Sequence, residues 1–179
     1  FGEARALLLD GRITVGELPF LTGISPLGAT AGEKIEITFQ GGNLGTEFKQ
    51  KYEAPAQAGI TLLHATVGGL RSNSIPFHID TVSQEREREP NAGLGSAQEL
   101  KPPVIVNGRI ETTGDADFYR VKGRGNHEMI VEIFARRLGS PVDASLTVFD
   151  NDGNQIAFND DHEDLASGLT THHADSRIS

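Results

Sequence analysis

Hydrophobic and polar residues of this 179-residue chain alternate in short runs, and the clearest run covers residues 34–40. Ile35, Ile37 and Phe39 alternate there with polar side chains. A period of two places the three apolar side chains on one face of a β-strand, whose other face meets water. The run ends at GGNLG (41–45), a sequence typical of a turn.

Runs of the same kind recur along the chain and are bounded by Gly, Pro, Asn and Asp. Residues 60–80 predict two strands joined across the turn Gly68-Gly69. Five further strand-like segments follow residue 103, namely 104–111, 117–123, 127–137, 144–150 and 154–160. Because long amphipathic helical patterns are hard to find, the sequence predicts an all-β protein with many turns.

Residues 81–103 interrupt this pattern, because they are charged, then rich in Gly and Pro, and almost free of large apolar residues. We therefore predict a linker there. The predicted organisation is a tail of a preceding segment (1–18), a first domain (19–80), the acidic linker (81–103) and a second domain (104–179). Several strands at this spacing favour two small antiparallel β-sandwiches.

Composition argues against several classes of function. The chain has 25 acidic and 16 basic residues and a formal net charge of −9, whereas affinity for nucleic acid comes mostly from Lys and Arg. No hydrophobic run approaches the roughly 20 residues that a membrane helix needs. No Cys is present for a disulfide or a Cys-based zinc site. We therefore expect neither a nucleic-acid partner nor a membrane span.

Residues 149–164 (FDNDGNQIAFNDDHED) look at first sight like a calcium-binding loop. An EF-hand loop that starts at Asp150 needs Gly at its sixth position and Glu at its twelfth, where this sequence has Gln155 and Asp161. The pair Asp152-Gly153 is instead typical of a tight hairpin turn, and apolar residues alternate after it as in a strand. We predict a β-hairpin.

Residues 139–174 contain no Lys or Arg, so this region carries most of the net negative charge. The acidic residues here and at its end are Asp143, Asp150, Asp152, Asp160, Asp161, Glu163, Asp164 and Asp175. One interpretation is a solvated acidic surface. The other is a surface that gathers divalent cations, with oxygen ligands that suit calcium rather than zinc. Asp160 and Asp161 are then its candidate ligands.

Catalysis has little support in the sequence. His162, His172, His173 and Asp175 are residue types that bind zinc, but their spacing matches no zinc motif, and surface histidines are the simpler interpretation. There is no Gly-x-Ser-x-Gly motif, and GGNLG lacks the Lys of a phosphate-binding loop. We therefore expect that this chain is not an enzyme.

Residues 24–45 (ISPLGATAGEKIEITFQGGNLG) and 72–79 (SNSIPFHI) resemble the IPT/TIG family of immunoglobulin-like domains. The resemblance covers about residues 19–80. It implies an immunoglobulin-like β-sandwich for the first domain and is nearly silent about function.

Residues from about 87 to 179 resemble the bacterial pre-peptidase C-terminal (PPC) domain, a jelly-roll β-sandwich appended to secreted peptidases and other exported proteins. The matching sequences are EREPNAGLGSAQEL (87–100), VNGRIETTGDADFYRV (106–121) and SLTVFDNDGNQIAFNDD (145–161). The family usually continues past the last residues of this chain with further strands. We therefore expect a C-terminally incomplete sandwich with an unpaired edge and an uncovered apolar face.

In clostridial collagenase modules of this wider family, calcium is held by acidic residues of the lead-in and by Asp residues near the start of the sandwich. The resemblance therefore implies a calcium site formed by Glu87, Glu89, Asn91, Asp115 and Asp117. The sequence departs from the family at Ala92, where Asp or Asn is common, so one ligand is missing. A charged linker without calcium is the alternative.

Together the two resemblances imply a non-catalytic accessory region of a larger secreted or cell-surface protein. Its expected roles are spacing, adhesion or substrate targeting, with calcium as the candidate cofactor. The expected partners are other domains of the same polypeptide and an extracellular polymer or protein ligand. One alternative is a segment of a secreted peptidase whose catalytic residues lie outside this chain, and another is a cell-envelope spacer without a ligand.

Overall fold

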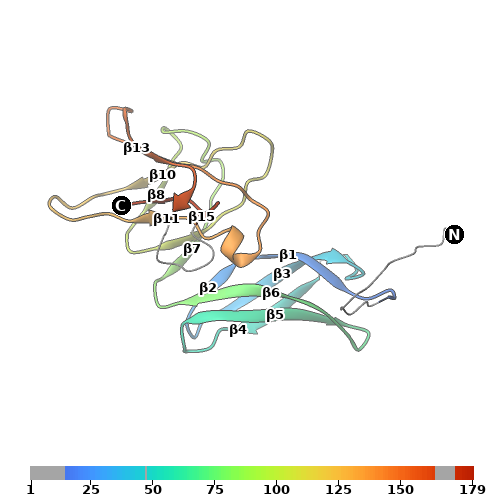
Figure 1. Ribbon diagram of the computed structural model, residues 1–179. Helices are drawn as coiled ribbons and strands as arrows, with labels where there is room; N and C mark the ends of the chain where they lie inside the picture. The colour runs from blue at the N-terminus through green and yellow to red at the C-terminus, as the bar shows by residue number, and fades with distance from the viewer. Residues whose placement is uncertain (1–14, 47, 164–171) are drawn as a thin grey trace.

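The computed structural model describes residues 15–46, 48–163 and 172–179, and nearly all regular structure within them is β-strand (Figure 1). The only helical element in these ranges is the 3-10 turn η1, Arg136–Leu138. The all-β prediction is therefore confirmed at the level of secondary structure. The strands form several small sheets rather than one large one.

Six strands make the first part of the molecule: β1 (Phe20–Ser25), β2 (Gly28–Thr30), β3 (Lys34–Gly42), β4 (Lys49–Glu53), β5 (Gly59–Val67) and β6 (Leu70–Asp80). They form two three-stranded sheets with the orders β1-β3-β4 and β2-β6-β5. The predicted hairpin across Gly68 and Gly69 is confirmed, because β5 and β6 pair antiparallel and Val67 lies opposite Leu70. Both glycines have positive φ, of 57° and 82°, which glycine adopts readily.

The hydrophobic core of the described residues lies in this first part and receives side chains from both sheets. Ile37 and Phe39 enter it from β3, as their alternation predicted, while Phe77 and Ile79 enter it from β6. Tyr52 meets Phe77 edge to face, with ring centroids 5.4 Å apart. Burial of these apolar side chains is the main stabilising contribution to this part.

The segment predicted as a linker, residues 81–103, contains two strands. β7 (Gln84–Arg86) pairs with β9 (Ile105–Asn107), and β8 (Gln98–Leu100) pairs with β10 (Tyr119–Val121). This segment is fixed by hydrogen bonds of polar side chains rather than by burial of apolar ones. Buried Gln98 accepts a hydrogen bond from the Arg88 N–H at 2.8 Å and donates one to the Arg86 carbonyl at 3.2 Å.

Strand direction differs from the antiparallel expectation in three places. The pairs β2–β6, β7–β9 and β8–β10 are parallel. A parallel pair needs a crossover connection between its strands, which a hairpin pattern in the sequence does not reveal. The two strands within residues 81–103 pair with strands that follow them in the chain. The boundary between two domains stays a prediction.

The remaining elements are β11 (Val131–Glu132), η1, β12 (Leu146–Phe149), β13 (Gln155–Asn159), β14 (His162–Glu163), β15 (His172–His173) and β16 (Arg177–Ile178). Each of the five segments predicted after residue 103 contains one strand, β9 to β13, although the strands are shorter than the segments. Three large apolar side chains of this region, Ile130, Ile156 and Phe158, are more than half exposed. Its described apolar core is small.

The two parts touch at defined contacts. The Leu27 N–H donates a hydrogen bond to Oδ1 of Asn107 at 3.1 Å. The ring of His78, on β6, stacks on Phe134 with centroids 5.5 Å apart. The guanidinium carbon of Arg137 lies 3.6 Å from the centroid of the same Phe134 ring. Phe134 therefore contacts His78 of the first part and Arg137 of the second part.

Candidate functional site

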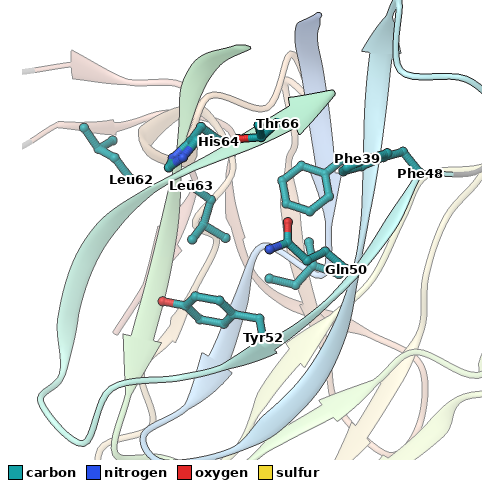
Figure 2. Close-up of a pocket in the computed structure, with 9 residues that line it drawn as sticks. Phe39, Phe48, Gln50, Tyr52, Leu62, Leu63, His64 and Thr66 are labelled. Carbon is teal, nitrogen blue, oxygen red and sulfur yellow. The ribbon is translucent and has the colours of Figure 1, made fainter. Parts of the chain in front are cut away.

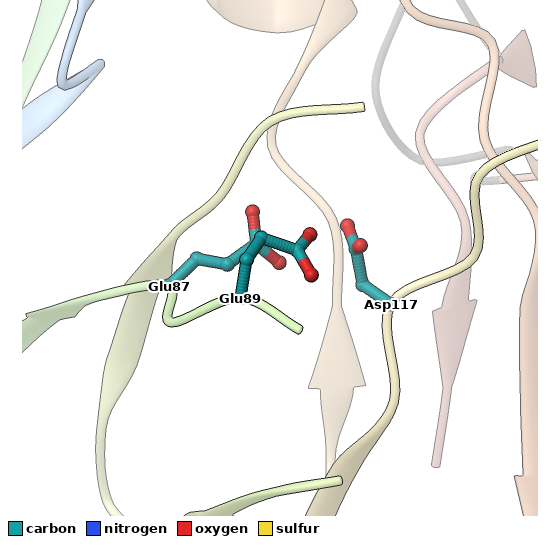
Figure 3. Close-up of side chains that lie close together, drawn as sticks. All are labelled: Glu87, Glu89 and Asp117. Atoms are coloured by element: carbon teal, nitrogen blue, oxygen red, sulfur yellow. The ribbon is translucent and has the colours of Figure 1, made fainter. Parts of the chain in front are cut away.

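Three carboxylates converge where residues 81–103 meet the second part of the molecule (Figure 3). Glu87, Glu89 and Asp117 each offer an oxygen, and these oxygens lie within 4.8 Å of one another. Glu87 directly follows β7, and Asp117 comes two residues before β10. Among the described residues, this is the only group of three or more His, Cys, Asp or Glu side chains with such spacing.

Glu87 is held by three hydrogen-bond donors. Its Oε1 accepts from Nδ2 of Asn91 at 2.8 Å and from the Tyr119 hydroxyl at 2.5 Å, while its Oε2 accepts from the Arg109 N–H at 2.7 Å. Partial burial by itself would raise the pKa of Glu87, but these donors outweigh it and the pKa is lowered. Glu87 is therefore ionised at neutral pH.

Gly108 allows this arrangement, because a Cβ at this position would lie 2.9 Å from Oε2 of Glu87. A side chain there would displace the carboxylate from the Arg109 N–H. This requirement comes from close approach and not from backbone conformation.

Asn91 joins the two segments of the site and is fully buried. Its N–H donates to Oε2 of Glu89 at 2.8 Å, and its carbonyl accepts from the Phe118 N–H at 2.9 Å. The second contact places Asp117 beside residues 87–91. The side-chain oxygen Oδ1 of Asn91 is buried without a hydrogen-bond donor, which is costly for a polar atom.

Asp117 also has a buried oxygen, Oδ1, without a hydrogen-bond partner. Burial, followed by the negative charge of Glu87 and a hydrogen bond with it, raises the pKa of Asp117 to about 7. The charges of Asp115 and Glu89 act in the same direction. No Lys or Arg among the described residues forms an ion pair with the three carboxylates, so the described part of the chain supplies no positive charge that balances them.

Four of the five residues implied by the PPC resemblance thus lie together, and Asp115 lies apart from them. Residues 112–114 form a turn, and Oδ2 of Asp115 accepts a hydrogen bond from the Glu111 N–H at 2.9 Å. Asp115 influences the site through its charge alone in this structure.

The acidic residues after Leu138 do not form a comparable group within the described residues. Asp150 holds the hairpin turn instead: its Oδ1 accepts from the N–H groups of Asp152 and Asn154 at 2.9 and 2.8 Å. Strands β12 and β13 flank this turn, so the hairpin prediction is confirmed. In the second candidate pair, the main-chain carbonyl of Asp160 accepts a hydrogen bond from Oγ of Ser176, and the main-chain carbonyl of Asp161 accepts one from Nδ2 of Asn159. Asp164 lies outside the described residues.

Among the residues considered for zinc, Asp175 is engaged in hydrogen bonds within the fold. Asp175 is fully buried and accepts hydrogen bonds from the N–H groups of residues 135–137 and from Nε of Arg137 at 2.8 Å. It is therefore not part of an acidic surface. The pairing of β14 with β15 places His162 opposite His173 and Glu163 opposite His172.

Two residues of the site were missed from the sequence. Tyr119 supplies the shortest hydrogen bond to Glu87, and Gly108 leaves room for that carboxylate. Tyr119 could have been found, because it stands two residues after Asp117 and shares its face in an extended segment. Gly108 had no signal, since its role depends on a side chain distant in the sequence.

Comparison of the chain with protein-family models, with curated proteins and with solved structures found no match. Both family resemblances therefore stay predictions. Within the described part of the chain, no helix is long and apolar enough to span a membrane.

Proposed function

We propose that this chain is a non-catalytic accessory region of a larger secreted or cell-surface protein, in which a bound divalent cation stiffens residues 87–91. The observation that carries the proposal is the convergence of Glu87, Glu89 and Asp117 around the buried side chain of Asn91. A cation bound there would tie the segment after β7 to the segment before β10. Stiffening of this kind suits spacing, adhesion or substrate targeting for other domains of the same polypeptide.

Calcium is the cation that we propose. The candidate ligands are all oxygens, which favours hard cations such as calcium and magnesium over zinc. Calcium takes 6–8 oxygen ligands at flexible geometry, so three carboxylates and Oδ1 of Asn91 would leave positions for water and main-chain carbonyls. Magnesium needs a nearly ideal octahedron, which side chains from two separate segments rarely supply.

We further propose that the two parts are an immunoglobulin-like β-sandwich and a PPC-like β-sandwich. Support for the first comes from the two three-stranded sheets that share one core. Support for the second comes from the lead-in residues 87–91, which contact the strand region around Asp117 as the resemblance implies.

Isothermal titration of the 179-residue chain with calcium tests the proposal. We expect binding at submillimolar calcium, at least tenfold weaker binding by Asp117→Asn, and no change for Asp143→Asn. Asp143 is an exposed carboxylate outside the site, so its variant controls for the loss of one negative charge. Magnesium at matched ionic strength controls for screening. The proposal fails if calcium does not bind below millimolar concentration, or if both variants weaken binding equally.

A further inference from the structure

The outer edge of β5, in the first part of the molecule, is unprotected. Within the described residues β5 pairs only with β6, so it ends its three-stranded sheet. Its sequence, GITLLHATV, has no Asp, Glu, Lys, Arg or Pro, and its pairing with β6 stays regular up to His64. Edge strands usually carry charges, prolines or bulges, because an open edge recruits another strand. The edge of β5 before His64 has none of these features.

The backbone of β5 offers hydrogen-bonding groups on its open side at three positions. The His78 N–H donates to the Leu27 carbonyl at 3.0 Å, so the backbone of His78 faces away from β5. Ile60 lies opposite His78, and backbone groups in an antiparallel ladder alternate in direction. The N–H and carbonyl groups of Ile60, Leu62 and His64 therefore point away from β6 and toward the open edge.

The side chains at these positions form an apolar row on the outer face of the sheet. Figure 2 shows Leu62 on the side of β5 that faces away from Tyr52. Ile60 and Leu62 are 59% and 62% exposed. The same face continues onto β6, where the ring of Phe134 stacks on His78. The second part of the molecule thus contacts the outer face at β6 and leaves its continuation at β5 exposed.

We propose that β5 binds β5 of a second copy of this chain, so that the two three-stranded sheets join into one. A closed dimer uses the same surface on both copies, and a strand that pairs with itself in this way runs antiparallel. With the twofold axis at Leu62, Leu62 faces Leu62 of the other copy and Ile60 faces its His64. This register pairs all three open positions with one another, and no other register does.

Two observations favour a second copy over a charged partner. β5 offers no charge that would attract such a partner, and identical apolar rows meet without repulsion. The paired row also continues the face on which Phe134 packs in each copy, so the two second parts would flank it. Pairing buries aliphatic surface that a single copy exposes to water.

The contact is small, which sets the expected affinity. Pairing of one short strand buries less than the roughly 1,200–2,000 Å² of stable protein interfaces. We therefore expect a weak dimer with a Kd of about 10–100 µM.

Sedimentation velocity of the whole chain at pH 8, over concentrations that span this Kd, tests the proposal. EDTA in the buffer separates the result from the calcium proposal. We expect a monomer–dimer equilibrium that Leu62→Lys weakens about tenfold or more, because two lysines then meet on the axis. The matched control is Ile156→Lys, since Ile156 lies on β13 and is 64% exposed. This variant should leave the equilibrium unchanged.

A mixture of two variants tests the register. Leu62→Lys and Leu62→Glu each place like charges on the axis, so each alone should be mostly monomeric. Mixed in equal amounts they should form a heterodimer, because opposite charges then face each other. Added salt should weaken this heterodimer and should not weaken the wild-type dimer, whose strand is uncharged and whose copies each carry a net charge of −9.

Circular dichroism and the melting temperature establish that each variant is folded. If Leu62→Lys does not fold, Ile60→Lys replaces it, because Ile60 is exposed to a similar degree on the same edge. Ile60→Lys should also weaken the dimer, since it places a charge in the apolar row.

Amide hydrogen exchange at low and high protein concentration locates the contact. Dimerisation should protect the amides of Ile60, Leu62 and His64, with little change at Thr61 and Leu63, which already pair with β6. A chain that stays monomeric at millimolar concentration, equal weakening by Leu62→Lys and Ile156→Lys, or protection confined to residues outside β5 would each overturn the proposal. A mixture of folded variants that gives no heterodimer, or a wild-type dimer that salt weakens, would overturn it as well.

Discussion

Replacement of Asp117 by Asn should stabilise the protein at pH 8 when no divalent cation is present. At this pH Asp117, whose pKa is about 7, is mostly ionised beside the ionised Glu87, and no described Lys or Arg side chain forms an ion pair with either carboxylate. Asn removes one negative charge and keeps the size of the side chain. A substitution in a candidate binding site would then raise stability while it lowers affinity for the cation.

The magnitude follows from the pKa of Asp117, which folding raises from an ordinary value of 3.8 to about 7. The folded state therefore binds more protons than the unfolded state between about pH 4 and pH 7, and the free energy of unfolding falls as pH rises through this range. The full pKa difference corresponds to about 4 kcal/mol as an upper bound. Because Asp117 is only partly buried, solvent screening reduces the expected gain at pH 8 to about 1–2 kcal/mol.

Urea unfolding followed by far-ultraviolet circular dichroism measures this effect, since the chain has no Trp for fluorescence. We expect Asp117→Asn to be more stable than the wild type by about 1–2 kcal/mol at pH 8 and by less than half of that gain at pH 5, where Asp117 of the folded state is still protonated. Saturating calcium should reverse the order, because the wild type gains more from binding. A gain that is the same at pH 5 and pH 8 would refute the electrostatic argument.

Three further predictions concern other contacts. Phe77→Ala, at a fully buried core position, should lower the free energy of unfolding by about 3–5 kcal/mol, and Phe158→Ala, at an exposed position, by less than about 1 kcal/mol; urea unfolding compares the two. Asp175→Asn should cost about 3 kcal/mol in the same assay, because it leaves Arg137 without its buried partner. The pKa of Asp175 is lowered by the Arg137 side chain and three backbone N–H groups against the effect of burial, so this contribution should be present at neutral pH and lost as pH falls below about 4. Tyr119→Phe removes a donor to Glu87 and should raise the pKa of that carboxyl, which a carbon-13 NMR titration detects; an unchanged pKa would mean that the hydroxyl does not hold Glu87.

The strands of the first part could be predicted because their apolar residues alternate and meet a common core. Ile37 and Phe39 are buried as their period of two required, and Gly68-Gly69 forms the turn between β5 and β6. The pairing of β7 with β9 could not be predicted in the same way. The side chains of Gln98 and Asn107 fix that region through hydrogen bonds, and such contacts leave no periodic signal.

The candidate site was predicted in part, and that part came from the PPC resemblance. Glu87, Glu89 and Asn91 were selected as a lead-in, and Asp117 as a residue of a following strand, and these four lie together. Asp115 was included because the PPC resemblance implied it together with Asp117. A turn at 112–114 precedes it, and its carboxylate binds the Glu111 N–H instead. A family resemblance does not reveal such a local turn.

The second part of the molecule depends on polar contacts to an unusual degree, and this explains why a cation could have a large effect there. Its buried polar residues, within the described part of the chain, are Asn91, Gln98, Asp175 and Ser176, whereas Ala135 and Leu138 are the buried apolar ones. Both carboxylate oxygens of Asp175 accept hydrogen bonds, so its buried charge is already compensated. Asn91 and Asp117 each keep a buried oxygen without a donor, and in a region with so little apolar burial these two atoms are where a bound cation would add most stability.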